Sequence, residues 1–253
     1  MTPGRWYLFY DGEIILQARP GKAPVPPLSS EPPFAPAGRV LTVGAQGGTL
    51  CYACMCNAEP PLAEGWVRLN MHAALAGIDP VFASLLPKAR QMVHWDTSSR
   101  FCASCGGRCQ PYSPNSKRCA SCGSEIFPTM AMAVLALVYR DDELLLVHAH
   151  SLKGPYYSCV AGYVEPGESL EECVRREILE ETNISVEDIR YFGSEPWPFP
   201  SLLMSAFSAR YAAGNIIVQQ SELSDAAFFP RNALPGLPPA YTLARRLIDA
   251  WVK

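Results

Sequence analysis

Three glutamates in the second half of the chain have a spacing that suits metal chemistry. Glu177, Glu180 and Glu181 lie within five residues of one another, and at about 100° per residue on a helix they share one arc of about 100°. Carboxylate oxygens are ligands that Mg²⁺ and Mn²⁺ prefer. Ions held there neutralise a pyrophosphate, orient its bridge and acidify an attacking water. The pattern is therefore one that suits a divalent-cation site acting on phosphate groups.

A solvated acidic helix face is the alternative interpretation of the same residues. Arg175 and Arg176 are close enough in sequence to pair with the glutamates and reduce their mutual repulsion. Ser169, with Glu172 three residues later, has the spacing of a capping box and predicts that the helix begins there. The residues by themselves leave both interpretations open.

The surrounding segment resembles the Nudix box, which is a glycine, five residues, a glutamate, seven residues, and then Arg-Glu-apolar-x-Glu-Glu-x-Gly-apolar. The matching positions are Gly162, Glu168, Arg176, Glu177, Ile178, Glu180, Glu181 and Ile184. Asn183 stands where the box has glycine, and asparagine tolerates the left-handed backbone of a helix end better than most residues. The chain is thus identified as similar to the Nudix hydrolases.

This resemblance implies both a fold and a set of roles. The fold is α/β, a Nudix α/β/α sandwich with a mixed sheet, and it agrees with the loose alternation of strand and helix patterns after residue 128. By resemblance, Glu177, Glu180 and Glu181 are catalytic and ligate magnesium or manganese. Glu181 positions or deprotonates the attacking water, and Arg176 orients the carboxylates.

Four cysteines form two matching pairs before this region. Cys102 and Cys105 are repeated by Cys119 and Cys122, each pair spans two intervening residues, and a glycine follows each pair. Four thiolates close a tetrahedral zinc shell, so the predicted zinc is structural. A redox dithiol is the alternative, and the matched flanks favour zinc. The other six cysteines are interpreted as free or buried thiols.

An aromatic segment after the box points to a substrate class. Residues 194–200 read Ser-Glu-Pro-Trp-Pro-Phe-Pro, a stiff stretch whose Trp197 and Phe199 could face a base or could pack as a buried staple. It is similar to the signature of the NADH pyrophosphatases among Nudix enzymes, which also carry a zinc ribbon before the Nudix domain. Glu195 in place of glutamine and Leu202 in place of serine depart from that signature, so the substrate preference is an open question.

The resemblance assigns further positions. Glu222 corresponds to an additional metal ligand, Ala244 to a backbone contact with substrate, and Tyr163 and Phe127 to aromatics that enclose the nicotinamide across a homodimer. The implied reaction cleaves NADH or NAD to nicotinamide mononucleotide and AMP, and NAD-capped RNA is a larger substrate with the same pyrophosphate. Diadenosine polyphosphates and ADP-ribose are alternative substrates.

A non-catalytic nucleotide sensor, whose ribbon contacts nucleic acid or protein, is the alternative from another class. The complete glutamate set argues against a sensor, because a sensor needs no metal-binding carboxylates. A nucleic-acid-binding ribbon would be expected to carry a basic stripe, whereas residues 101–127 hold only three basic side chains, Arg108, Lys117 and Arg118.

The remaining sequence predicts the organisation of the chain. Its 253 residues carry a formal charge of −3 and no apolar run long enough for a membrane span. No basic, apolar leader is present at the start, so the expected location is cytoplasmic. The predicted domains are a small, mainly β N-terminal domain (1–95), a zinc ribbon (96–127) and a Nudix domain (128–253).

Within the N-terminal domain, residues 6–10 and 13–16 read as two strands around Asp11-Gly12. Seven prolines between residues 20 and 36 predict an extended surface loop. Asp79-Pro80 predicts a helix start, with Pro87 interrupting that helix and a second helix running to Trp95.

Overall fold

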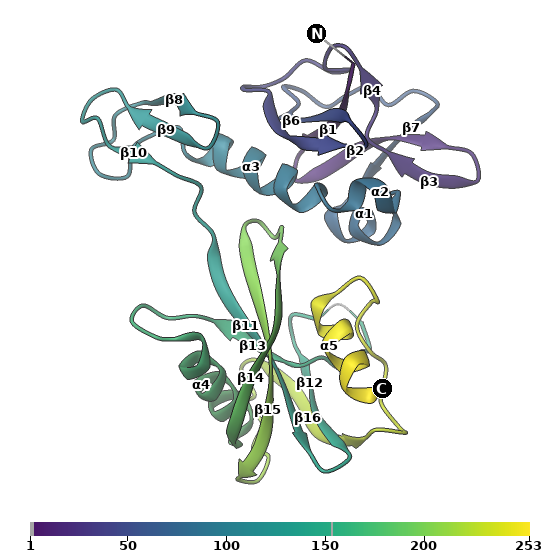
Figure 1. Ribbon diagram of the computed structural model, residues 1–253, viewed down its shortest axis with the longest axis vertical. Coiled ribbons are helices and arrows are strands. Elements are labelled where there is room, and N and C mark those ends of the chain that lie inside the picture. The colour runs from purple at the N-terminus through teal and green to yellow at the C-terminus, as the bar shows by residue number, and fades with distance from the viewer. Residues whose placement is uncertain (1–2, 153) are drawn as a thin grey trace. The chain divides into compact units, whose positions relative to one another are not determined.

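The computed structural model describes residues 3–152 and 154–253, which form two units (Figure 1). The N-terminal unit comprises Met1–Met130 together with the turn Pro198–Ser201. The C-terminal unit comprises Ala131–Trp197 and Leu202–Lys253. Among the described residues, no helix is long and apolar enough to cross a membrane.

A seven-stranded sheet forms the body of the N-terminal unit. Five strands lie in the order β3-β2-β1-β6-β5, while β4 pairs with β1 and β7 pairs with β2. The bounds are β1 Gly4–Tyr10, β2 Glu13–Arg19, β3 Lys22–Val25, β4 Leu28–Ser29, β5 Leu41–Gln46, β6 Thr49–Met55 and β7 Trp66–Leu69. The predicted hairpin is confirmed, because Asp11 and Gly12 take φ values of 48° and 78° and pair β1 with β2.

The proline-rich segment is more ordered than a surface loop, which corrects that prediction. It contains the short strands β3 and β4, and Val25, Pro26 and Pro27 are buried. These prolines do not interrupt pairing, because Pro26 and Pro27 lie between β3 and β4, and Pro24 is in β3, which is at the edge of the strand order.

Three helices follow the sheet: α1 Met71–Gly77, α2 Pro80–Ala83 and α3 Leu86–Ser98. Asp79 caps α2 as predicted, and its side chain accepts a hydrogen bond from the Val81 amide. The predicted role of Pro87 is wrong, since α2 ends at Ala83 and Pro87 lies in the first turn of α3. A proline costs nothing there because the first amides of a helix have no helical partner.

A three-stranded ribbon follows α3 within the same unit. It consists of β8 Cys109–Ser113, β9 Ser116–Cys119 and β10 Glu125–Ile126, in the order β10-β9-β8. Lys117 ties it to α3: its ammonium group donates a hydrogen bond to the Asp96 carbonyl at 2.6 Å and lies 3.1 Å from the Asp96 carboxylate. The ribbon therefore has one face anchored on the end of α3.

The C-terminal unit is a mixed sheet between two helices, which confirms the predicted α/β/α sandwich (Figure 1). The strands run in the order β14-β15-β11-β12-β16, with β13 also on β11; β11 and β15 are parallel and the other pairs antiparallel. The bounds are β11 Ala131–Arg140, β12 Glu143–Ala149, β13 Val160–Tyr163, β14 Ser185–Trp197, β15 Leu202–Ala213, β16 Leu223–Pro230, α4 Leu170–Thr182 and α5 Leu243–Val252. Helix α4 packs on one face of the sheet and α5 on the other.

Candidate active site and metal centres

Helix α4 carries the predicted carboxylates, and local interactions fix both of its ends. The capping box is confirmed, because Ser169 accepts a hydrogen bond from the Glu172 amide while the Glu172 carboxylate accepts one from the Ser169 amide. Asn183 ends the helix in the left-handed region, with φ 58° and ψ 24°. Its side-chain amide donates to the Asn215 carbonyl at 3.1 Å. Asparagine thus takes the backbone conformation expected of the glycine it replaces.

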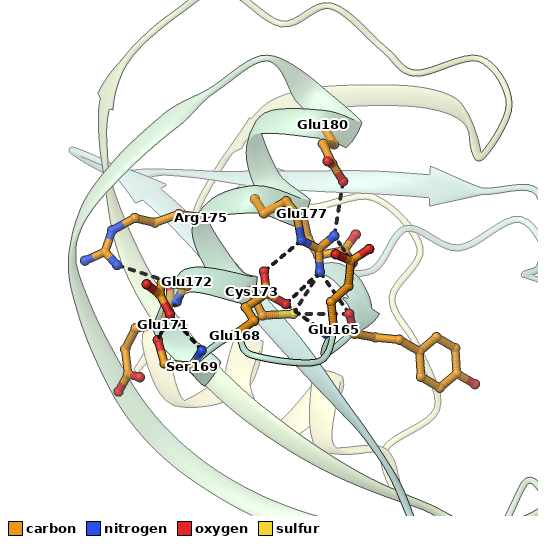
Figure 2. Close-up of polar contacts among 11 residues, drawn as sticks. Glu165, Glu168, Ser169, Glu171, Glu172, Cys173, Arg175, Glu177 and Glu180 are labelled. Carbon is orange, nitrogen blue, oxygen red and sulfur yellow. Dashed lines mark hydrogen bonds and ion pairs between the residues drawn. The ribbon is translucent and has the colours of Figure 1, made fainter.

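Arg176 is the centre of the polar network on this helix, and Figure 2 labels its carboxylate partners Glu168, Glu177 and Glu180. Its guanidinium group donates to both oxygens of Glu168 at 2.8 and 3.0 Å, to Glu177 at 2.8 Å and to Glu180 at 3.1 Å. It also donates to the Tyr163 carbonyl at 2.9 Å. One cation therefore fixes three carboxylates and the end of β13, and its hydrogen bonds hold the pKa of Glu168 down at about 2.

Glu177 packs directly against the glycine that opens the box. A Cβ atom at Gly162 would lie 1.8 Å from the Glu177 carboxyl carbon, so no larger residue fits at that position with this side chain in place. The carboxylate is buried, and this burial raises its pKa despite the hydrogen bond from Arg176. The absence of a side chain at Gly162 therefore leaves the space that the Glu177 carboxylate occupies. The motif alone does not explain why a glycine is required at this position.

Glu181 lies one turn further along and is 4% exposed. Its Oε2 atom is buried and has no hydrogen-bond partner. Burial, followed by the charges of Glu177, Glu222 and Glu180, raises the pKa of Glu181 to about 8. A buried carboxylate without a partner is costly to ionise, and a bound cation would remove that cost. This donor set fits a hard divalent ion.

The predicted ligand Glu222 is near these groups, because its charge raises the pKa of both Glu177 and Glu181. It follows β15, in the segment whose Gln219 amide donates to the Glu181 carbonyl at 3.0 Å. Among the residues that the structure describes, the glutamates are not gathered with ligand atoms within 4.8 Å of one another, as four cysteines are. Water and phosphate oxygens complete the shell of Mg²⁺ in many sites, so closer convergence is not required.

The four cysteines of the ribbon form that second cluster. The Sγ atoms of Cys102 and Cys122 are 3.7 Å apart and those of Cys105 and Cys119 are 3.5 Å apart. Zn–S bonds of about 2.3 Å in a tetrahedron place sulfurs about 3.8 Å apart, so the arrangement fits zinc. A hydrogen bond from Ser124 lowers the pKa of Cys122 to about 6, which favours the thiolate that a metal needs.

The residues predicted to bind substrate are divided between the two units. Tyr163, Trp197 and Ala244 belong to the C-terminal unit, whereas Phe127 and Phe199 belong to the N-terminal unit. Tyr163 and Phe127 are 61% and 58% exposed. Phe199 stacks on His72 with ring centroids 4.2 Å apart and packs against the N-terminal core.

Glu195 has a partner that the sequence did not reveal. Its carboxylate forms an ion pair with Arg246 on α5, and Arg246 also donates to the Tyr241 carbonyl at 3.1 Å. The charge that replaces glutamine in the aromatic signature is therefore compensated within the same unit. The signal in the sequence was weak, because the two residues are 51 positions apart.

Comparison with known proteins places the chain among characterised families. Residues 129–252 match the model of the NUDIX domain, and residues 3–95 match that of the NADH pyrophosphatase-like rudimentary NUDIX domain. A Chromobacterium violaceum protein named NAD-capped RNA hydrolase NudC is 36% identical over 252 residues, or 97% of this chain and 91% of the relative. The chain belongs to the NADH pyrophosphatase family of Nudix hydrolases.

Two further matches are a sequence relative and a solved structure. A Pseudomonas fluorescens protein, also named NAD-capped RNA hydrolase NudC, is 39% identical over 190 residues, covering 74% of this Nudix chain and 68% of the relative. A solved NUDIX hydrolase from Nitrosomonas europaea has 24% sequence identity and a TM-score of 0.47, and the match covers 60% of this chain and 86% of that one.

Proposed function

We propose that this Nudix hydrolase cleaves the pyrophosphate bond of NADH and NAD, giving nicotinamide mononucleotide and AMP, and removes NAD caps from RNA. Relatives that align with most of the chain are named NAD-capped RNA hydrolases, which supports this substrate class. The observation that carries the chemistry is the buried Glu181 carboxylate. Its Oε2 atom has no hydrogen-bond partner in the protein, and the charges of Glu177, Glu180 and Glu222 act on it. Such a carboxylate is suited to binding a metal cation or to accepting a proton.

Magnesium or manganese at Glu177, Glu180, Glu181 and Glu222 would neutralise the charge of the pyrophosphate and lower the pKa of the attacking water. The chain's own residues do the rest. Glu181 holds the attacking water by a carboxylate oxygen and takes up its proton, because a cation bound beside it would keep this carboxyl group ionised. Arg176 fixes Glu168, Glu177 and Glu180 before substrate arrives. This preorganisation reduces the rearrangement needed during the reaction.

The metal in the ribbon has a different role in this proposal. Cys102, Cys105, Cys119 and Cys122 supply four sulfurs, which leaves no open position for a substrate. We therefore assign structural zinc to the ribbon, where it would hold together the two turns at Gly106 and Gly123. Both glycines adopt positive φ values, 74° and 75°, as the repeated Cys-x-x-Cys-Gly pattern predicts.

Other expectations from the sequence remain part of the proposal. They are the domain boundaries at residues 95 and 127, the cytoplasmic location, and a homodimer in which Phe127 and Tyr163 enclose the nicotinamide. Trp197, Phe199 and Ala244 are the other proposed substrate contacts. The stack of Phe199 on His72 favours a packing role for that ring, so Trp197 is the better test of base recognition.

A substrate panel tests the proposed function. NADH, NAD, NAD-capped RNA, diadenosine tetraphosphate and ADP-ribose are compared with Mg²⁺ or Mn²⁺, with products separated by chromatography. The proposal predicts the highest kcat/KM for the nicotinamide substrates. Faster cleavage of diadenosine tetraphosphate or ADP-ribose would replace the proposed substrate by the alternative, and no cleavage of any compound would support a nucleotide sensor.

A further inference from the structure

One face of the ribbon carries alternating cationic and aromatic side chains. Gln110 of β8 lies opposite Arg118 of β9, and a bridge places Phe101 opposite Arg108. Opposite residues share a face, and residues two apart on a strand share it too, so Arg108, Gln110 and Arg118 point to the same side. Tyr112 joins them through contact with Arg118. We call these five residues the outer face of the ribbon.

The rings of the outer face are open to solvent although each is stacked. Phe101 is 57% and Tyr112 is 53% exposed. The guanidinium carbon of Arg118 lies 3.4 Å from the centre of the Tyr112 ring, and that of Arg108 lies 5.8 Å from the centre of Phe101. Both arginines are exposed, and Arg118 reaches its carboxylate partner, Glu125, only at 3.8 Å. Two solvent-exposed arginine–aromatic pairs therefore lie on one surface.

The opposite face of the ribbon carries a cysteine of the cluster and a lysine that is already paired. Cys119 contributes its sulfur to the cysteine cluster. Lys117 is buried, lies 5.2 Å from the ring centre of Trp95 and pairs with Asp96. Of the three basic residues between Phe101 and Phe127, the two that are exposed, Arg108 and Arg118, are therefore both on the outer face, an asymmetry that the sequence did not show.

Single-stranded RNA has the chemistry that this surface fits. Its phosphates pair with guanidinium groups, and its unpaired bases stack on aromatic rings and on guanidinium planes. A double helix would satisfy the arginines but would keep its base faces inside the stack. An acidic protein surface would pair with the arginines but would offer no bases to stack on the rings of Phe101 and Tyr112.

We propose that the outer face of the ribbon binds the single-stranded RNA chain of an NAD-capped substrate. The proposal rests on the proposed function for the identity of the RNA, but binding itself requires no hydrolysis. With two arginines, binding is modest, tolerant of sequence and weakened by salt. NADH, which lacks an RNA chain, gains nothing from this surface.

Direct binding is measured on the full-length, zinc-loaded protein without Mg²⁺ or Mn²⁺, by fluorescence anisotropy of a labelled, uncapped RNA of about 12 nucleotides. We expect Arg108→Gln/Arg118→Gln to weaken binding about 10-fold and to reduce the slope of log K against log salt by about 1.4, since each phosphate contact on a single strand contributes about 0.7. Tyr112→Leu weakens binding by about 10-fold, and Tyr112→Phe restores it.

Two controls keep this measurement decisive. Arg140→Gln removes an arginine that stacks on Phe228 at 3.8 Å in the C-terminal unit, and it should leave RNA binding unchanged. Gln110→Glu places a negative charge between the two arginines without removing a contact of the fold, and it should weaken binding even if the double variant loses zinc. The proposal would be overturned if Arg140→Gln lost as much RNA affinity as Arg108→Gln/Arg118→Gln. It would also be overturned if Gln110→Glu bound RNA as tightly as the wild type.

Kinetics separate this inference from the proposed function. In Arg108→Gln/Arg118→Gln we expect KM for NAD-capped RNA to rise about 10-fold while kcat/KM for NADH stays within about twofold. A parallel fall for both substrates would mean that the ribbon acts through the fold and would refute RNA binding by its outer face. If NADH and capped RNA are both inert but the variant still loses RNA affinity, the proposed function fails and the ribbon surface stands.

Discussion

Replacing Glu181 with glutamine should make the metal-free protein more stable while abolishing hydrolysis. The carboxyl group has an ordinary pKa of 4.5 and a pKa of about 8 in the fold. A raised carboxyl pKa contributes stability that is fully present below pH 4.5 and is lost as the pH rises through 8. Ionising this group at pH 8 costs at most about 4 kcal/mol. Water entry and the titration of neighbouring carboxylates reduce that figure, so we expect the variant to gain about 2 kcal/mol at pH 8.

The assay is urea denaturation at pH 5 and pH 8, with hydrogen exchange of the α4 amides reporting the unit that contains Glu181. Divalent ions are removed by dialysis without a chelator, because a chelator would also strip the ribbon. The variant should match the wild type at pH 5 and exceed it at pH 8, and Mg²⁺ should stabilise only the wild type at pH 8. Glu171→Gln, an exposed change on the same helix, is the control. Equal stability of Glu181→Gln and wild type at both pH values would refute the argument that this carboxylate is buried without a partner.

Three other changes test separate parts of the site. Gly162→Ala should reduce kcat by at least about 100-fold, because its Cβ would displace Glu177; activity close to that of the wild type would show that the space at Gly162 is not needed. For the pair of Glu195 with Arg246, Arg246→Gln should raise KM for NADH about 10-fold. Adding Glu195→Gln to the same chain should reverse most of that rise, because the unpaired carboxylate is then gone. Additive effects of the two substitutions on KM would exclude coupling between these residues. Asn183→Gly should change unfolding free energy by less than about 0.5 kcal/mol and Asn183→Ala should cost about 1 kcal/mol, because only alanine resists the left-handed backbone; equal costs would mean that the side-chain bond to Asn215 decides the stability.

The parts of the fold that the sequence predicted are those with strong local signals. Ser169 with Glu172 defines the start of α4 through its own hydrogen bonds, and Asp11-Gly12 forms a turn that pairs its flanking strands. Strand β14 was not predicted, because its polar residues and Pro196 suit an edge strand and show no clear alternation. Tertiary pairing with β15 makes it a strand.

For the site, the sequence predicted the residue types but not their surroundings. Spacing on α4 groups Glu177 with Glu181, but only the fold shows that Gly162 gives Glu177 room and that Glu181 lacks a partner. The pairing of Glu195 with Arg246 depends on where α5 crosses the sheet, which periodicity cannot specify.

Binding of Mn²⁺, followed by electron paramagnetic resonance as the ion is titrated into zinc-loaded protein at pH 8, tests the central claim most directly. The wild type should bind the ion, and Glu177→Gln/Glu181→Gln should lose that binding together with NADH hydrolysis while Glu171→Gln keeps both. A double variant that still binds Mn²⁺ and hydrolyses NADH at the wild-type rate would contradict the assignment of the metal site to the carboxylates of α4.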